Sequence, residues 1–144
     1  MKVVPAALIF GIMVAGAAIG HEVQQPAAGS PDRKAILDGL RENEVMRRLS
    51  AEWKAKIVFS HVTIRQAKDW AWVVASAQTE DEKHIIEPLS SVMREKGGRW
   101  QVVEFISDEV APADNPEAAY RAWRAQFMGR HPDCPARIFP EKFD

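Results

Sequence analysis

The stretch DWAWVVASA, residues 69–77, is the most strand-like segment of this 144-residue chain. Its aromatic and β-branched residues favour an extended backbone. Alternate side chains of a strand point to opposite faces, which places Trp70 and Trp72 on one face and Ala71 and Val73 on the other. Because both faces are apolar, we predict a central strand that is covered on both sides, with a small domain built around it.

Two hairpins are predicted around this strand. Residues 57–65 (IVFSHVTIR) are rich in β-branched residues, and residues 66–69 are predicted to form a four-residue loop into the Trp70 strand. Residues 89–95 and 100–106 are predicted to pair around Gly97-Gly98, a strong two-residue turn signal. The expected pairs are Arg65 with Trp70, Thr63 with Trp72, His61 with Val74, Phe59 with Ser76, Glu95 with Trp100, Met93 with Val102, Ser91 with Glu104 and Leu89 with Ile106.

Helices are predicted on either side of the hairpins. Ser30 and Pro31 are typical of a helix start, and apolar residues at helical spacing predict a long or broken helix over residues 31–54, weakened at Gly39 and Asn43. A second helix is predicted from Asn115-Pro116 to Gly129. The predicted fold class is α+β: an N-terminal helix packed on a curved antiparallel sheet of about four strands, plus a C-terminal helix and an irregular tail.

The first twenty residues resemble a secretory signal peptide. A short basic start is followed by an apolar run over residues 3–14 and by small residues over 15–20. The alternative is an uncleaved membrane anchor, since the segment is near the lower length limit for a span. We predict a signal peptide over residues 1–20, a flexible segment over 21–30, a single domain over 31–144, and a periplasmic or secreted location.

Composition limits the partners. A formal net charge of −1 gives no electrostatic basis for binding nucleic acid or an anionic membrane. After signal cleavage, no stable membrane insertion is expected. The single cysteine, Cys134, excludes an intrachain disulfide. No Gly-rich phosphate loop or catalytic serine motif is present, so no cofactor is predicted.

Four short segments suggest a family resemblance: residues 32–38, 69–73, 97–104 and 138–140. Together they resemble a group of small secreted bacterial proteins of uncharacterised function. The helix-then-sheet layout of that group is similar to the cystatin-like and NTF2-like folds. The resemblance implies this fold and export, and it implies no catalytic residue.

Glu104 and His61 are the candidate catalytic residues. In the predicted register Glu104 lies within an apolar face, where an ionised carboxylate needs a partner or a pocket. Its alternatives are a place at the sheet rim or an ion pair with an arginine such as Arg121 or Arg124. His61 is a base, a ligand contact or a partly exposed strand residue.

Five aromatic residues are candidates for binding a ligand or a partner, although the same spacing is typical of a core. His131 and Cys134 are three residues apart, but a zinc site needs further ligands and no metal site is predicted. Cys134 is also a candidate nucleophile, or a free thiol that could pair with another molecule. The five aromatic candidates are Trp70, Trp72, Trp100, Tyr120 and Trp123.

Three functions are compatible with this pattern. The leading hypothesis is a non-enzymatic exported domain that binds a small ligand or an envelope protein. One alternative is a small NTF2-like pocket enzyme that transfers a proton through Glu104 or His61. The other is an inhibitor or structural partner of a secreted enzyme. An enclosed cavity with Glu104 and a second polar group facing inward would favour the enzyme, and a filled core with an exposed aromatic strip would favour protein binding. A fully packed core without either feature would leave the function open.

Overall fold

The computed structural model describes residues 22–106 and 114–142. The fold is α+β, as predicted. The predicted signal peptide lies outside the described residues. Within them, no helix is both long enough and apolar enough to cross a membrane. The elements in chain order are α1 (Pro31–Arg41), α2 (Glu44–Trp53), β1 (Ile57–Ala67), β2 (Trp70–Thr79), β3 (Ile85–Lys96), β4 (Arg99–Ile106), α3 (Pro116–Arg130) and the short 3₁₀ helix η1 (Ala136–Ile138).

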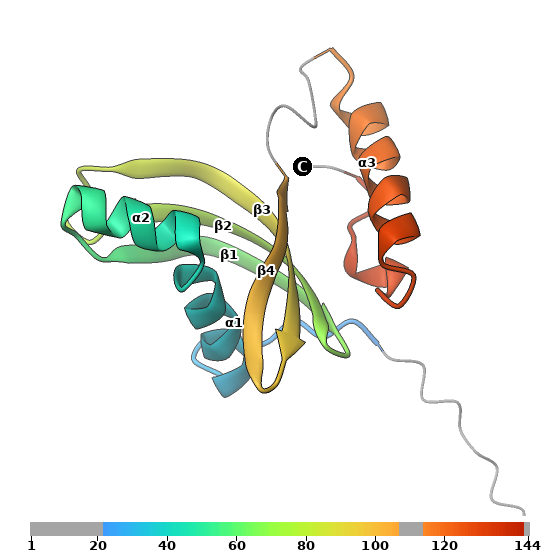
Figure 1. Cartoon of the computed structure of the whole chain (residues 1–144), viewed down its shortest axis with the longest axis horizontal. Coiled ribbons are helices and arrows are strands. Elements are labelled where there is room, and N and C mark those ends of the chain that lie inside the picture. The colour runs from blue at the N-terminus through green and yellow to red at the C-terminus, as the bar shows by residue number, and fades with distance from the viewer. Residues whose placement is uncertain (1–21, 107–113, 143–144) are drawn as a thin grey trace, which may run out of the picture.

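The sheet is antiparallel, with the strand order β1-β2-β3-β4. Figure 1 shows it strongly curved, with α1 and α2 on one face and α3 on the other. The predicted central strand is β2, which has a strand on each side and a helix layer over each face. Trp70 and Trp72 are buried on the α3 face, and Ala71 and Val73 are buried on the α1 face. The prediction that both apolar faces of this strand are covered is therefore confirmed.

The prediction of one N-terminal helix was wrong, because two helices precede the sheet. Helix α1 begins after Ser30, whose hydroxyl accepts a hydrogen bond from the Arg33 backbone N–H at 3.2 Å. It ends at Arg41, and Asn43 then caps α2 by accepting from the Val45 N–H at 2.9 Å. An asparagine side chain that bonds the backbone in this way favours a helix start over a helix interior. The break therefore falls at one of the two positions that the sequence marked as weak.

The first hairpin is tighter than predicted. Strand β1 continues to Ala67, so the loop has two residues and Arg65 pairs with Trp72 instead of Trp70. A shift of two residues leaves every side chain on its predicted face. Between Ser60 and Thr63, however, β1 has one extra residue. This bulge moves Phe59 opposite Ala77, on the α1 face.

The second hairpin turns at Gly97-Gly98 as predicted, and both glycines have positive φ angles, 58° and 78°. Positive φ at both central residues is the requirement of the type I′ turn, which glycine meets without strain. The pair of Glu95 with Trp100 is also confirmed. Beyond Met93 the predicted register was wrong. An extra residue in β4 places Glu104 opposite Val92 and Phe105 opposite Ser91.

Each face of the sheet has its own core. On the α1 face, small strand residues let the helix approach closely. A β-carbon on Gly39 would lie 2.3 Å from the Trp100 carbonyl oxygen, so only glycine fits there. On the α3 face, large aromatic rings fill a wider gap. The buried residues of the first core are Ile36, Leu40, Ile64, Ala71, Val73, Ala75, Met93 and Trp100, and those of the second include Trp70, Trp72, Tyr120, Trp123, Phe127, Ile138 and Phe139.

Both chain segments that flank the domain are tied to β1. Gln24 forms an isolated antiparallel bridge with Gln66, a contact that the sequence did not predict. At the other end, the Arg65 guanidinium donates to the Ile138 and Arg137 carbonyl oxygens, both at 2.9 Å. The tail thus lies across the domain and places Phe139 in the α3-face core, and it contains the short helix η1 where an irregular segment was predicted.

Candidate functional site

An open groove lies between α1 and the start of β1, with a volume of about 420 Å³. Lys34, Asp38 and Arg41 are three and four residues apart, so their side chains follow one face of α1. Lys56 adds a fourth position at the start of β1. We call this site the basic groove. Its lining residues are Gly29, Arg33, Lys34, Leu37, Asp38, Arg41 and Lys56.

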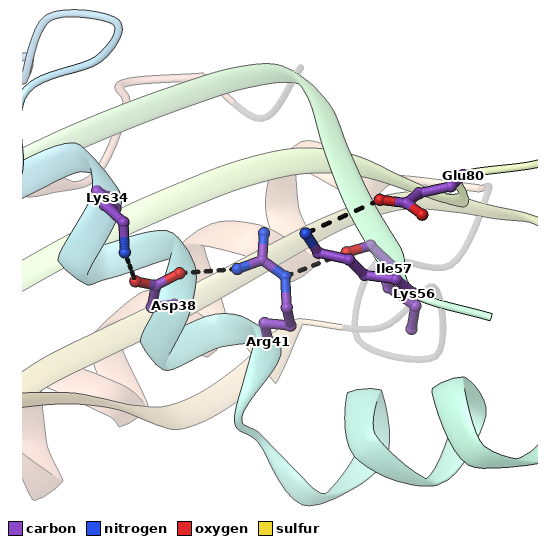
Figure 2. Close-up of polar contacts among 6 residues, drawn as sticks. All are labelled: Lys34, Asp38, Arg41, Lys56, Ile57 and Glu80. Carbon is purple, nitrogen blue, oxygen red and sulfur yellow. Dashed lines mark hydrogen bonds and ion pairs between the residues drawn. The ribbon is translucent and has the colours of Figure 1, made fainter. Parts of the chain in front are cut away.

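Asp38 is the centre of the polar contacts in the basic groove (Figure 2). Its carboxylate accepts from Lys34 Nζ at 2.5 Å and from Arg41 Nη1 at 2.8 Å, through different oxygens. The hydrogen bond from Lys34 and the positive charges of Lys34 and Arg41 hold the pKa of the Asp38 carboxyl below its usual value. Asp38 is therefore ionised at neutral pH and balances one of the positive charges.

Two arginines of the basic groove are held by backbone oxygens. Arg33 donates to the Pro26 and Val62 carbonyls at 3.4 and 3.2 Å. Arg41 donates from Nε to the Ile57 carbonyl at 3.1 Å. A carbonyl oxygen orients a guanidinium group but does not neutralise it. These bonds therefore fix the positions of the charges and leave their field in the groove.

The groove has a surplus of positive charge. Four cationic side chains line it, against the single carboxylate of Asp38. Lys56 faces Glu80 at 3.8 Å, and both side chains are more than half exposed, so this pair is weak. The whole chain has a net charge of −1. The basic groove therefore concentrates positive charge on a protein whose net charge is slightly negative. This local positive charge is suited to binding an anion.

Glu104 lies on the α3 face, not in the apolar face predicted for it. The extra residue in β4 turns its side chain toward α3. There it accepts from the Trp123 indole Nε1 at 2.8 Å and from Arg130 Nη2 at 3.0 Å. The sequence alternative of an arginine partner holds, but the partner is Arg130 and not Arg121 or Arg124. Both carboxylate oxygens are therefore engaged in contacts that hold α3 on the sheet.

His61 is the residue at the β1 bulge. Its φ angle is +50° and its side chain is exposed. A bulge residue has no direct partner on the neighbouring strand, which explains both features. It lies at the opposite edge of the sheet from Glu104, since β2 and β3 separate β1 from β4. The structure thus does not bring the two catalytic candidates together.

The aromatic candidates are divided between the two cores. Trp70, Trp72, Tyr120 and Trp123 pack on the α3 face, and Trp100 packs on the other. All five are at most 6% exposed. The Trp72 ring contacts Tyr120, Trp123 and Phe139 with centroids 5.6 to 6.1 Å apart. These rings therefore form part of the interior of the domain.

Cys134 lies in the tail after α3 and is buried in the α3-face core, 3% exposed. Burial raises the pKa of its thiol to about 12, which leaves almost no thiolate at neutral pH. Within residues 22–106 and 114–142, no three His, Cys, Asp or Glu side chains cluster as a metal site requires. Neither feature offers a reactive centre.

The residues of the basic groove were not among the candidates found in the sequence. The pattern RKAILDGLR, residues 33–41, does place three charged side chains on one helix face, and that signal was available. The position of Lys56 beside this row of charges could not be predicted, because it depends on how α1 packs against β1. Comparisons of this chain with family models, curated proteins and solved structures found no match.

Proposed function

We propose that this protein is an exported, non-enzymatic domain that binds a small anionic ligand in the basic groove. The observation that carries the proposal is the set of four cations around an open groove that contains one carboxylate. Arg33 and Arg41 are oriented by backbone carbonyls before any ligand arrives. Such preorganisation lowers the entropy cost of binding.

Export is the second part of this proposal. It is supported by the basic start, the apolar run over residues 3–14 and the small residues over 15–20. We also propose that the fold is related to the cystatin-like and NTF2-like layouts. The support is the curved antiparallel sheet with α1 and α2 on one face.

A proton-transfer enzyme has less support. Both oxygens of Glu104 are engaged by Trp123 and Arg130, and His61 is exposed on β1, three positions away from β4 in the sheet. General acid–base chemistry needs such groups within reach of one substrate. Ligand binding without chemistry is the simpler use of the groove.

Two-dimensional NMR of the amide groups tests the proposal directly. Titration with pyrophosphate and with citrate at low ionic strength should shift the amide signals of residues 33–41 and 56–57 in a saturable manner. Added salt should weaken the binding, because exposed charges are screened. Glucose, a neutral control, should cause no shift. Saturable shifts confined to α3, or none with either anion, would contradict anion binding in this groove.

A further inference from the structure

The charges of the basic groove also limit what kind of anion it can select, if the proposed function holds. Four cations against Asp38 leave a surplus of three positive charges, and including Glu80 leaves two. A singly charged anion would leave this surplus only partly balanced. An anion with two or three charges would balance it. Charge complementarity therefore favours a multiply charged ligand.

Arg41 is the best placed anchor for such a ligand. Its Nε is bonded to the Ile57 carbonyl and its Nη1 to Asp38. The guanidinium also lies over the Phe59 ring, 5.4 Å from its centroid. Among the described residues, Nη2 has no hydrogen-bond partner. A guanidinium held on three sides presents the two N–H donors of Nη2 in a fixed direction, as oxyanion recognition requires.

Asp38 acts as an internal competitor for the ligand. It already supplies a carboxylate to Lys34 and Arg41. A ligand with one carboxylate offers these cations little that Asp38 does not, and it is repelled by the Asp38 charge. Asp38 repels a multiply charged ligand more strongly, but the additional oxyanion groups of that ligand reach Arg33 and Lys56, which have no carboxylate partner within the groove.

We propose that the basic groove selects a compact oxyanion with two or more negative charges, such as a phosphate or polycarboxylate group. In this arrangement Arg41 anchors the ligand, and Asp38 competes with every anion for Lys34 and Arg41. The proposal rests on anion binding as the function of the groove. It adds the charge class of the ligand and the carboxylate that competes with the ligand.

Calorimetric titration of the purified protein with pyrophosphate, citrate and acetate tests this proposal. Pyrophosphate or citrate should bind at least about tenfold more tightly than acetate, since charge-assisted contacts add with each oxyanion group. Preference between pyrophosphate and citrate identifies the phosphate or carboxylate chemistry. If acetate binds in the groove as tightly as both, the charge selection is wrong while the proposed function stands. If none of the three binds, both proposals fail.

Matched double variants locate the binding. Lys34→Gln with Lys56→Gln removes two exposed charges from the groove and should weaken pyrophosphate or citrate binding about tenfold or more. Lys96→Gln with Lys142→Gln removes two exposed charges elsewhere and should change it less than about threefold. Equal weakening by both would show attraction to net charge alone and overturn the site.

The Asp38→Asn variant tests the role of Asp38 separately. Removing the competing carboxylate should strengthen acetate binding about fivefold and pyrophosphate binding by more than that, because the repulsion that is removed is proportional to the charge of the ligand. Circular dichroism checks that the variant is folded. An unchanged ratio of pyrophosphate to acetate affinity in this folded variant would overturn the role of Asp38.

Discussion

On the α3 face of the sheet, large aromatic rings fill the space between helix and strands, whereas on the α1 face small side chains bring the helix close to the backbone. The α3 face buries Trp72 and Trp123, and Glu104 accepts the hydrogen bond of the Trp123 indole N–H. The α1 face brings Gly39 against Trp100 and leaves the charged row of α1 at the surface. The aromatic rings between α3 and the sheet form a closed core. Helix α1 packs closely on the other face, and the basic groove lies open beside it.

Removing a large ring should break the α3 face. Trp72 is 2% exposed and contacts three other rings. Trp72→Ala should lower the free energy of unfolding by about 3–5 kcal/mol, because it removes the buried surface and leaves a cavity. Urea denaturation measures this. A loss below about 1 kcal/mol would mean that the α3 face is not a packed core.

The close approach of α1 is tested by one glycine and its matched control. Gly39→Ala would place a β-carbon against the Trp100 carbonyl and should destabilise by about 1–3 kcal/mol through overpacking. Gly129→Ala, in α3, has open space around it and should stabilise by about 0.5–1 kcal/mol through helix propensity. The comparison fails if both substitutions change the unfolding midpoint in the same direction.

Alkaline pH tests how completely the α3 side is closed. Burial raises the pKa of the Cys134 thiol from 9.0 to about 12. The unfolded chain therefore loses this proton from pH 9 upward while the folded protein keeps it, so stability is full below pH 9 and falls as the pH rises toward 12. Between pH 8 and pH 10 the loss from this thiol should be about 1 kcal/mol.

The control for the alkaline measurement is Cys134→Ala, which lacks the thiol. Its free energy of unfolding should fall less between pH 8 and pH 10 than that of the natural protein. Tyr120, whose pKa burial raises from 10.0 to about 12, contributes to both proteins in the same direction. Identical pH dependence of the two proteins would mean that Cys134 is open to solvent in solution.

Much of the fold was predictable because it depends on local patterns. The alternation in residues 69–77, the Gly97-Gly98 turn and the cap at Ser30 each act over a few residues. The errors about which face a side chain occupies lie where one residue is added to a strand. Bulges at His61 and beside Glu104 changed the face of every residue beyond them. No signal within either strand marks those positions.

The candidate site was less predictable than the fold. Glu104 was singled out because it interrupted an apolar pattern, and the structure explains that interruption by its bonds to Trp123 and Arg130. The basic groove was not predicted, because charged residues on a helix face are common and are usually only solvated. Its significance depends on Lys56, which is distant from α1 in the sequence.

The sequence by itself determined the α+β class, the central strand and its two buried faces, because side-chain alternation and turn chemistry are properties of neighbouring residues. The tertiary structure decided the register beyond each bulge, the pairing of Glu104 with α3 and the meeting of α1 with Lys56. These features depend on how far apart the packed layers lie. That spacing is set by the volumes of residues distant in sequence, from Gly39 on one face to Trp72 on the other.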